Sequence, residues 1–142
     1  MSQNALYNRY LHSPKVKQIA ESLEQPLAKI QLKGLLGSSF SFVFNALFKN
    51  SEKPFLLIFN EKEEAAYYLN DLEQMIGAND VLFYPSSYRR PYQIEETDNA
   101  NVLLRSEVLN RINSRKKPAV IVTYPEALFE KVVTRKELDK NT

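Results

Sequence analysis

The chain has 142 residues, of which 44% are hydrophobic and 25% are charged, a composition typical of one soluble globular domain. Its 19 lysines and arginines against 17 aspartates and glutamates leave a net charge of +2, which does not indicate a basic surface built for nucleic acid. The absence of cysteine excludes disulfides, thiolate metal sites and a cysteine nucleophile, and it favours a reducing, cytoplasmic environment.

Two further absences narrow the class of protein. No apolar run approaches the roughly 20 residues that span a bilayer, and the N-terminal segment lacks the apolar core of a signal peptide. His12 is the single histidine, so neither a catalytic triad nor a histidine metal site is predicted. We therefore expect a soluble cytoplasmic protein with no metal site and no membrane contact.

The predicted elements begin with an amphipathic helical segment at 15–23, which ends at Gln25-Pro26 and is expected to pack on the domain from outside. A first strand is predicted over 28–36, followed by a Gly-Ser turn and a helix over 40–48 that is apolar on most sides and therefore buried. The apolar run at 55–59 predicts a strand covered on both faces, in the centre of the sheet.

The second half of the chain continues this alternation. Helical spacing predicts a helix over 62–76, with Gly77 as a left-handed cap. A strand at 81–84 precedes a long irregular loop over 86–98 and a helix over 99–114 capped by Asp98. The inner side of that helix is assigned to Val102, Leu103, Val108, Leu109 and Ile112, and the outer side to Arg105, Glu107 and Arg111. A fourth strand at 119–123 and a short helix at 125–132, started by Pro125, complete the pattern.

Strand and helix alternate along the whole chain. This order predicts an α/β fold with an open, mainly parallel sheet, helices on both faces and right-handed crossovers. A receiver-like interaction domain would need acidic residues at its strand ends, whereas the predicted strands end at Asn60, Tyr84 and Thr123. The sequence therefore disfavours that alternative.

The turn after the first predicted strand reads GLLGSSFSF from Gly34 to Phe42, the place of a phosphate-binding loop. An active loop reads GxxxxGK followed by Ser or Thr, because main-chain N–H groups and the lysine bind the phosphates and the hydroxyl holds magnesium. Aligned on Gly34, this pattern puts Ser39 at the second glycine, Phe40 at the lysine and Ser41 at the hydroxyl. We predict a degenerate loop that binds no ATP and a helix capped by the hydroxyl of Ser38 or Ser39. The loop residues are Gly34, Gly37, Ser38, Ser39, Phe40 and Ser41.

Aromatic and basic side chains alternate in the long loop that follows the third predicted strand. Such side chains suit base stacking and phosphate binding, but Pro85 and Pro91 also stiffen the loop, so that its tyrosines can pack onto the sheet. Contact with DNA, contact with a protein and plain packing stay open as interpretations. The candidate contact residues are Tyr88, Arg89, Arg90, Tyr92 and Arg105.

The segment Thr123-Tyr124-Pro125 resembles the Thr-Pro motif by which helicase domains present a helix N-terminus to a nucleic-acid phosphate. A proline in the first turn of a helix is also sufficiently explained by helix geometry. The structural and functional interpretations both stay open.

Taken in order, these segments resemble the amino-terminal domain of the bacterial transcription-repair coupling factor family, Mfd. The resemblance runs from about Gln31 to Val132 and depends on GLLGSSFSFVFNALF, PFLLIFNEKEEAAYYLNDL, VLFYPSSYRRPY and VIVTYPEALF. That domain is similar to the first helicase-like part of the repair protein UvrB, in which the Walker A loop is intact. The resemblance therefore implies a RecA-like, P-loop helicase fold whose Walker A loop has decayed at Ser39 and Phe40.

The resemblance also implies a domain organisation. Residues 1–26 would form an N-terminal helical segment, residues 27–134 a UvrB-like α/β subdomain, and residues 135–142 a charged stretch that leads to a following module. A coupling factor carries a UvrA-binding module, an RNA polymerase-binding module and a translocase motor that uses ATP and magnesium. The expected partners through the parent protein are UvrA, RNA polymerase, DNA and the other domains of the same protein.

Function follows as an expectation from this resemblance. The chain would be a non-catalytic module with a structural and regulatory role, supporting the UvrA-binding module of an ATP-dependent translocase, with no cofactor of its own and weak or no DNA binding. The alternative is a stand-alone small α/β nucleotide-binding or hydrolase-like protein.

Overall fold

The computed structural model describes residues 3–87, 98–114 and 116–130. The helices in these ranges are α1 (Gln3–Leu11), α2 (Pro14–Leu23), α3 (Ser39–Ser51), α4 (Lys62–Ile76), α5 (Asn99–Ser114) and α6 (Pro125–Phe129), and the strands are β1 (Phe55–Ile58), β2 (Val81–Tyr84) and β3 (Val120–Thr123). None of the helices in these ranges has the length and apolar character needed to cross a bilayer.

The three strands form a parallel sheet in the order β1-β3-β2. Phe55 of β1 and Val81 of β2 both pair with Val120, so the outer strands flank β3 in register. The predicted α/β class with an open parallel sheet is confirmed. The prediction that 55–59 is the central strand is wrong, because β1 lies at an edge and β3 occupies the centre. An apolar run indicates that other elements pack on both faces of the strand, but it does not indicate whether the strand lies in the centre or at the edge of the sheet.

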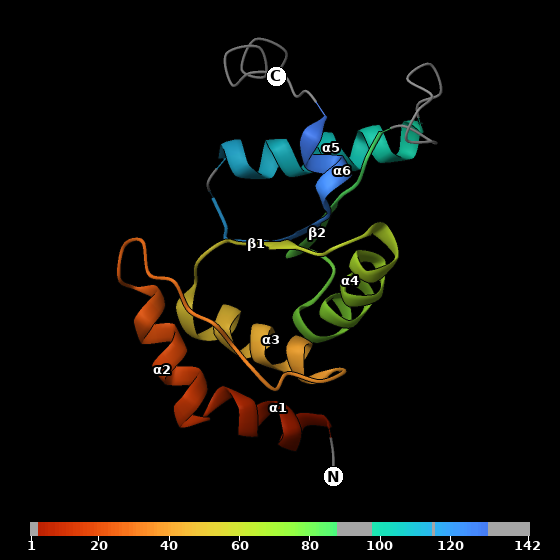
Figure 1. The fold of residues 1–142 in the computed structure, drawn as a ribbon. Helices are drawn as coiled ribbons and strands as arrows, with labels where there is room; N and C mark the ends of the chain where they lie inside the picture. The colour runs from red at the N-terminus through yellow and green to blue at the C-terminus, as the bar shows by residue number, and fades with distance from the viewer. Residues whose placement is uncertain (1–2, 88–97, 115, 131–142) are drawn as a thin grey trace.

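The helices lie in layers on both sides of the sheet, as predicted. Figure 1 shows α5 and α6 on one face, α3 and α4 on the other, and α1 and α2 beyond α3. Because α3 lies between the sheet and the N-terminal helices, it is apolar on most sides, and Val43, Ala46 and Leu47 are buried. The packing of α2 from outside is confirmed through buried Val16. Helix α1, where Tyr7 and Tyr10 contact Phe42, precedes the helix that periodicity predicted at 15–23 and lies within the predicted N-terminal helical segment, residues 1–26.

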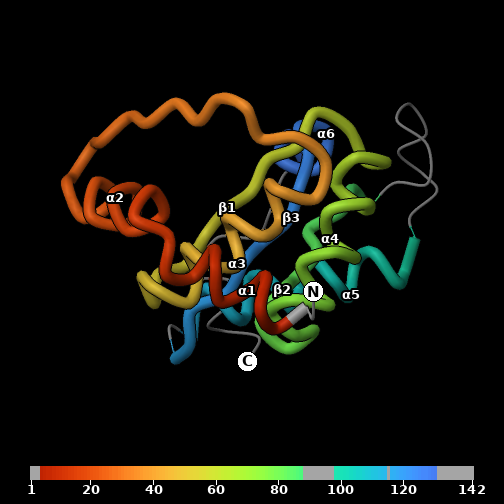
Figure 2. The backbone as a smooth tube through the Cα atoms, turned by 90° about the horizontal axis from the view of Figure 1, so that it is seen from below, coloured from red at the N-terminus to blue at the C-terminus, as the bar shows by residue number. Residues whose placement is uncertain are grey.

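Residues 28–36, here called the strap, are extended but form no strand, so the strand predicted there is wrong. Figure 2 shows the strap arching away from β1 between α2 and α3. The main chain of residues 29–35 makes no hydrogen bond to the other described residues. Leu27, which precedes the strap, has a φ of 61°, and Gly34 and Gly37 also have positive φ. Polar and apolar residues alternate in the strap, as in a strand, but the strap has no neighbouring strand among the described residues with which to pair.

Helices α4 and α5 keep their predicted bounds. Gly77 ends α4 with a φ of 109°, although its ψ of 140° lies outside the left-handed helical region that was predicted. The predicted cap of α5 is confirmed, since Asp98 Oδ1 accepts hydrogen bonds from the N–H groups of Ala100 (3.0 Å) and Asn101 (3.4 Å). The predicted inner side of α5 is partly wrong, because only Val108 is fully buried and Leu109 packs on the core. The exposed members of that set are Val102, Leu103 and Ile112.

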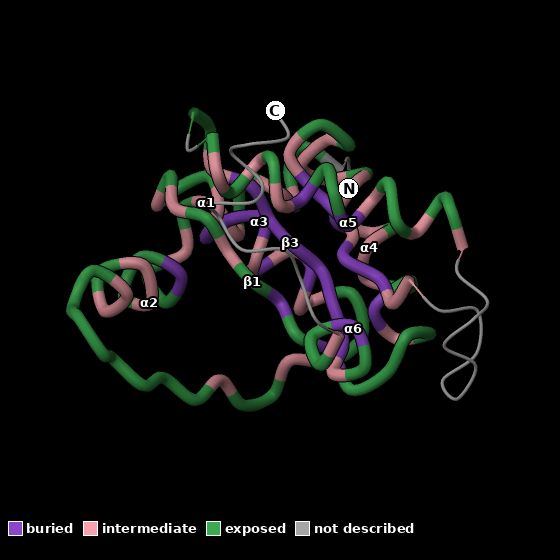
Figure 3. Tube along the Cα trace, turned by 90° about the horizontal axis from the view of Figure 1, so that it is seen from above, coloured by how far each residue is buried: buried purple, intermediate pink, exposed green. Residues whose placement is uncertain are grey.

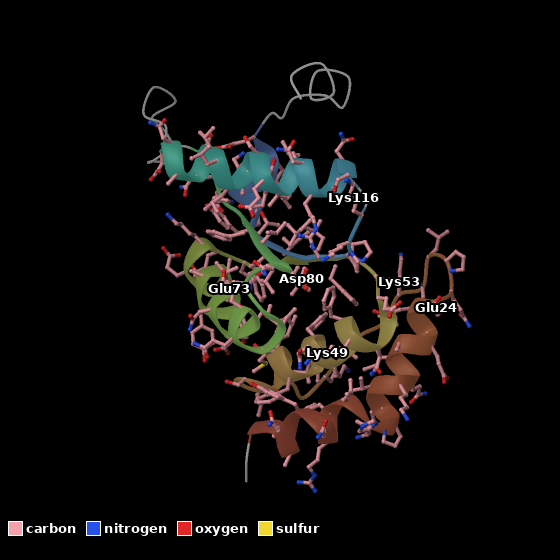
Figure 4. All side chains as sticks on the ribbon, turned by 180° about the vertical axis from the view of Figure 1, so that it is seen from behind. Glu24, Lys49, Lys53, Glu73, Asp80 and Lys116 are labelled. Carbon is pink, nitrogen blue, oxygen red and sulfur yellow. The ribbon has the colours of Figure 1, made fainter. Side chains whose placement is uncertain are left out.

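Two ion pairs fasten the ends of elements to their neighbours. Lys53 Nζ lies 3.0 Å from Glu24 Oε2 and joins the end of α2 to the segment that enters β1, as Figure 4 shows. Arg111 Nη2 lies 2.8 Å from Asp80 Oδ1, and the same guanidinium donates to the main-chain oxygens of Asn79, Lys117 and Pro118. Arg111 therefore fastens the end of α5 to the starts of β2 and β3.

Candidate functional site

The loop at the start of α3 holds the six residues of the predicted degenerate site. Gly34 and Gly37 adopt φ values of 80° and 54°, which other residues rarely adopt, and the backbone turns at Gly37 and Ser38 directly before the helix. The hydroxyl of Ser39 donates to the carbonyl of Leu36 (2.7 Å), and Ser38 makes no side-chain cap. The predicted hydroxyl cap at Ser38 or Ser39 is therefore wrong, because the hydroxyl of Ser39 stabilises the turn that precedes the helix.

Ser41 is the residue that the predicted alignment puts at the magnesium-binding hydroxyl of an active loop. Here the side chain is fully buried, and its hydroxyl donates to Asp71 Oδ2 of α4 at 3.4 Å. The hydroxyl thus joins α3 to α4 inside the protein. In this arrangement Ser41 supports the packing of the two helices.

Phe40 is the residue that the predicted alignment puts at the lysine of an active loop. Its ring lies 4.4 Å from the Phe44 ring, 4.9 Å from the Tyr68 ring and 5.5 Å from the Phe59 ring, measured between centroids. Phe59 and Tyr68 stack on one another at 4.8 Å. This aromatic cluster joins the first turn of α3 to the end of β1 and to α4. The Phe40 ring therefore holds the loop against the core by apolar contacts and offers no positive charge to a phosphate.

A second cluster lies at the carboxyl ends of β2 and β3, where open α/β sheets commonly bind ligands. At its centre Arg105 Nη1 lies 3.1 Å from Glu130 Oε2, with less than a tenth of either side chain exposed. The same nitrogen donates to the carbonyls of Pro85 and Ala127, both at 2.9 Å. The guanidinium carbon also lies 4.1 Å from the centre of the Tyr84 ring. Arg105 thereby ties α5 to the ends of both strands.

Glu130 receives several further hydrogen bonds from the segment after β2. The hydroxyl of Ser86 donates to Oε1 at 2.7 Å, and the hydroxyl of Ser87 donates to Oε2 at 2.9 Å. The Ser87 N–H is shared between the two carboxylate oxygens, at 2.9 and 3.1 Å. The Ser86 N–H donates to the hydroxyl of Tyr124 at 2.8 Å. The carboxylate therefore fills the position that a bound anion would take at these strand ends.

The electrostatics of this cluster follow from burial and from these partners. Burial alone would raise the pKa of Glu130, but the Ser86 and Ser87 hydroxyls, the Arg105 guanidinium and the Ser87 N–H outweigh it and lower that pKa. Burial raises the pKa of Tyr84 against the opposing effect of Arg105, and burial also raises the pKa of Tyr124. At neutral pH the cluster is an ion pair ringed by neutral phenols, with no carboxylic acid poised for proton transfer.

Arg105 was predicted on the outer side of α5, and that placement is wrong. Its side chain is buried, because the end of β2 and α6 offer it two carbonyls and a carboxylate. Its buried Nη2 has no hydrogen-bond partner among the residues that the structure describes. A contact between Arg105 and a partner stays a prediction, and the other four candidate contact residues, Tyr88, Arg89, Arg90 and Tyr92, lie outside the described residues.

The Thr-Pro-like motif has a structural use in the fold. Thr123 is fully buried, and its hydroxyl donates to the carbonyl of Tyr84 at 2.8 Å across the two strands. Tyr124 is buried and precedes α6, with Pro125 in the first turn. The helix that follows has five residues, too few for a helix terminus to hold an anion by its dipole alone.

Ser86, Ser87 and Glu130 are the cluster members that sequence reasoning missed. Glu130 lies 43 residues after Ser87 in the chain, and no local pattern joins them. The sequence did contain one indication of this cluster, because Ser86 and Ser87 directly follow the strand and Pro85, and hydroxyl side chains at strand ends can bind an anion. No group of three or more His, Cys, Asp or Glu side chains that could hold a metal ion occurs among the residues that the structure describes.

Comparison with curated proteins finds two significant relatives, both named transcription-repair-coupling factor. The protein of Bacillus subtilis (strain 168) is 27% identical over 126 residues, which are 89% of this chain and 10% of that protein. The protein of Rickettsia bellii (strain RML369-C) is 25% identical over 92 residues, which are 64% of this chain and 8% of that protein.

The chain thus spans about a tenth of the length of these relatives. No protein-family model matches the chain, and no solved structure gives a significant match. The resemblance stated from the sequence is confirmed: over most of its length, this α/β chain is similar to a small part of transcription-repair-coupling factors.

Proposed function

We propose that this chain is a non-catalytic, UvrB-like module of a transcription-repair coupling factor. In that setting the parent protein would be a cytoplasmic ATP-dependent DNA translocase that removes stalled RNA polymerase and recruits excision repair. The similarity to two proteins of that name supports the setting. The ATP and magnesium of the parent would then belong to a motor outside these residues.

The observation that carries the non-catalytic role is the position of Phe40. The aromatic cluster of Phe40, Phe44, Phe59 and Tyr68 occupies the start of α3, where a RecA-like fold would hold the phosphates of a nucleotide. A triphosphate needs cationic neutralisation and free main-chain N–H groups. Here the loop offers an apolar ring in place of the lysine, and the hydroxyl of Ser41 faces Asp71. These contacts support a degenerate Walker A loop whose remaining use is structural.

The carboxyl-end cluster supports the same proposal from the other side of the sheet. Glu130 uses the anion-binding groups of Ser86, Ser87 and Arg105 for itself, which leaves them unavailable to an external phosphate. We propose that direct DNA binding through this surface is weak or absent and that DNA, UvrA and RNA polymerase meet other modules of the parent. The role of this chain would be to support its neighbours, above all a UvrA-binding module.

The test uses the natural polypeptide that contains these residues, with RNA polymerase stalled on a DNA template. We expect ATP-dependent displacement of the polymerase, and we expect Ser41→Ala to leave the ATPase rate within about twofold, because a dispensable loop needs no magnesium ligand. If the unmodified polypeptide does not displace the stalled polymerase, the chain is not part of a coupling factor. A large fall in ATPase rate in Ser41→Ala, with unchanged folding, would contradict the degenerate loop.

A further inference from the structure

The carboxylate of Glu130 is held by groups that come from outside its own segment. The hydroxyls of Ser86 and Ser87, the Ser87 N–H and the Arg105 guanidinium all point at its two oxygens, at 2.7 to 3.1 Å. Ser86 and Ser87 follow β2 and Arg105 lies on α5, whereas Glu130 follows α6. Hydroxyls, main-chain N–H groups and guanidinium groups are also the donors with which proteins bind phosphate. We call Ser86, Ser87 and Arg105 the oxyanion site.

Contacts other than those with Glu130 hold the oxyanion site in place. The carbonyl of Ser86 accepts a hydrogen bond from Asn101 Nδ2 at 3.0 Å, and the carbonyl of Ser87 accepts one from the Asp98 N–H at 2.7 Å. Arg105 is held by two main-chain carbonyls and by the face of an aromatic ring. Because these contacts do not involve the carboxylate, we expect the donors to keep their positions when it leaves.

The guanidinium of Arg105 has a donor that Glu130 does not use. Its Nη1 bonds the carboxylate, but its Nη2 is buried and has no hydrogen-bond partner among the described residues. A carboxylate has two oxygens, whereas a phosphate has four in a tetrahedron. A phosphate can therefore pair with both terminal nitrogens of a guanidinium and keep oxygens for the serines. Since an unpaired buried donor is destabilising, a phosphate would satisfy this site more completely than the carboxylate does.

The segment that carries Glu130 is packed loosely apart from the carboxylate. Ala127 of α6 is fully buried, but Leu128 and Phe129 are 41% and 87% exposed. In Figure 3 the tube of β3 is purple, and exposed positions in green appear around α6. Glu130 itself has an extended backbone, with φ of −68° and ψ of 140°, so the helix has already ended there. Glu130 can therefore leave the oxyanion site without moving Ala127 out of the core.

We propose that Ser86, Ser87 and Arg105 form a binding site for a terminal phosphate group, and that Glu130 is an internal substitute ligand that closes this site. Inorganic phosphate and the phosphate of a monoester share the required chemistry. Less than a tenth of the Arg105 side chain is exposed, so the anion has to enter by one end, as the Glu130 carboxylate does. A phosphodiester carries substituents on two oxygens and would need an open groove.

Competition with Glu130 controls the affinity of this site. A tethered carboxylate has a high effective concentration, so in the unmodified chain phosphate binds weakly. Loss of the carboxylate removes the competitor and leaves Arg105 buried without a negative partner, so phosphate should then bind and stabilise the fold. By linkage, phosphate in the site favours release of the segment after α6, and a force that draws this segment away opens the site.

Rescue of Glu130→Ala by inorganic phosphate tests the site. Urea unfolding of the 142-residue chain at neutral pH is compared in phosphate and in chloride of equal ionic strength. At about 50 mM phosphate we expect the folding equilibrium constant of Glu130→Ala to rise at least about tenfold, as a dissociation constant of about 5 mM gives. The unmodified chain and Glu126→Ala, at an exposed position on α6, should rise less than about twofold, which measures the general effect of phosphate on protein stability.

Two further comparisons assign the rescue to these residues and to a terminal phosphate. Adding Ser87→Ala to Glu130→Ala removes one donor, so the rescue should fall below about twofold. Adding Ser106→Ala instead, at an exposed serine of α5 whose hydroxyl bonds the carbonyl of Val102, should leave the rescue unchanged. Methyl phosphate should rescue Glu130→Ala as inorganic phosphate does, and dimethyl phosphate should not.

Three outcomes would overturn the proposal. Equal effects of phosphate on Glu130→Ala and Glu126→Ala would show that no site is opened. Full rescue in the presence of Ser87→Ala would place the phosphate elsewhere. Equal rescue by dimethyl phosphate and methyl phosphate would contradict a site for a terminal phosphate.

A second variant covers the case in which Glu130→Ala has no folded state even in phosphate. Glu130→Gln keeps the shape of the side chain and removes its charge, and its folding equilibrium constant should rise at least about threefold in the same phosphate buffer. No rise beyond that of Glu126→Ala would then overturn the proposal. These measurements involve neither ATP hydrolysis nor polymerase displacement, so failure here is distinct from failure of the proposed function.

Discussion

Two regions of the sheet differ in how far they are covered: β2 with β3, here called the closed side, and β1 with the strap, here called the open side. Around β2 and β3, α5 and α6 close the face, and the Arg105–Glu130 pair closes the carboxyl ends. Around β1, alternate side chains are exposed and the strap makes no main-chain bond to the sheet. On the closed side, polar side chains pair with one another, whereas on the open side β1 has no second neighbouring strand among the described residues.

The contrast concerns how the polar groups of each side are paired. Buried polar groups must be paired, and the closed side pairs nearly all of them internally. An edge strand with free main-chain groups is usually protected by charge, proline or a covering element. Leu56 and Ile58 are exposed and uncharged, so the outer residues of β1 have no charge that would protect this edge.

The largest expected effect concerns the ion pair of the closed side. Glu130→Ala leaves Arg105 buried without its carboxylate, so we expect the free energy of unfolding to fall by about 3–5 kcal/mol. Glu126→Ala, at an exposed position on α6, is the control and should change it by less than about 0.5 kcal/mol. Urea unfolding of the 142-residue chain measures both. Similar values for the two variants would mean that the pair adds nothing to the closed side.

The next largest effect separates neighbouring leucines of β1. Leu57 is buried under α3 and α4, and Leu57→Ala should lower the free energy of unfolding by about 2–5 kcal/mol. Leu56 is exposed and lines an apolar hollow with Ile112 of α5 and Leu128 of α6, so Leu56→Ala should cost less than about 0.5 kcal/mol in the 142-residue chain. The same unfolding experiment decides the point. An equal cost at both positions would show that the open face is already covered.

A pH series sharpens the account of the closed side. The pKa of Glu130 is lowered in the folded protein, so its contribution to stability is complete above the unfolded pKa, near 4.5, and is lost as the pH falls through the folded value. Wild type should therefore exceed Glu130→Gln in stability at neutral pH, and this difference should shrink as the pH falls below 4.5. Thermal unfolding at a series of pH values measures it. A difference that stays constant would assign the stabilisation to uncharged contacts.

The smallest effect concerns strain on the open side, which holds both described non-glycine residues with positive φ, Leu27 and Glu52. The Leu27 side chain is exposed, so Leu27→Gly removes little packing and relieves a backbone conformation that favours glycine. We expect a gain of about 0.5–1 kcal/mol in unfolding free energy. Leu27→Ala keeps the strain and should give no gain, and a gain in both variants would place the effect elsewhere.

The sequence predicts those parts of the fold that depend on local periodicity and capping. The bounds of α4 and α5 and the cap at Asp98 need only local spacing and one carboxylate, and they match. The central position of β3 could not be predicted, because strand order depends on partners far apart in the chain. The strap has the pattern of a strand without a neighbour to pair with, so pattern alone predicted a strand there.

The candidate site divides in the same way. The prediction of a degenerate loop needs only the sequence, because the phosphate-binding pattern has fixed spacing and puts Phe40 at its lysine. The aromatic contacts that Phe40 makes, and the capture of Ser86 and Ser87 by Glu130, join segments that are distant in the chain. Only the folded arrangement brings those residues together, and it also turns Arg105 inward against the predicted outer side.

The most direct test of a non-catalytic loop is calorimetric titration of the 142-residue chain with ATP and magnesium, beside the Ser39→Gly, Phe40→Lys variant that restores the loop pattern. We predict no binding heat from the unmodified chain, because the Phe40 ring packs against Phe44, Phe59 and Tyr68 and offers no cation to a phosphate. Saturable binding in the micromolar range by the unmodified chain would contradict the account and make the loop an active nucleotide site.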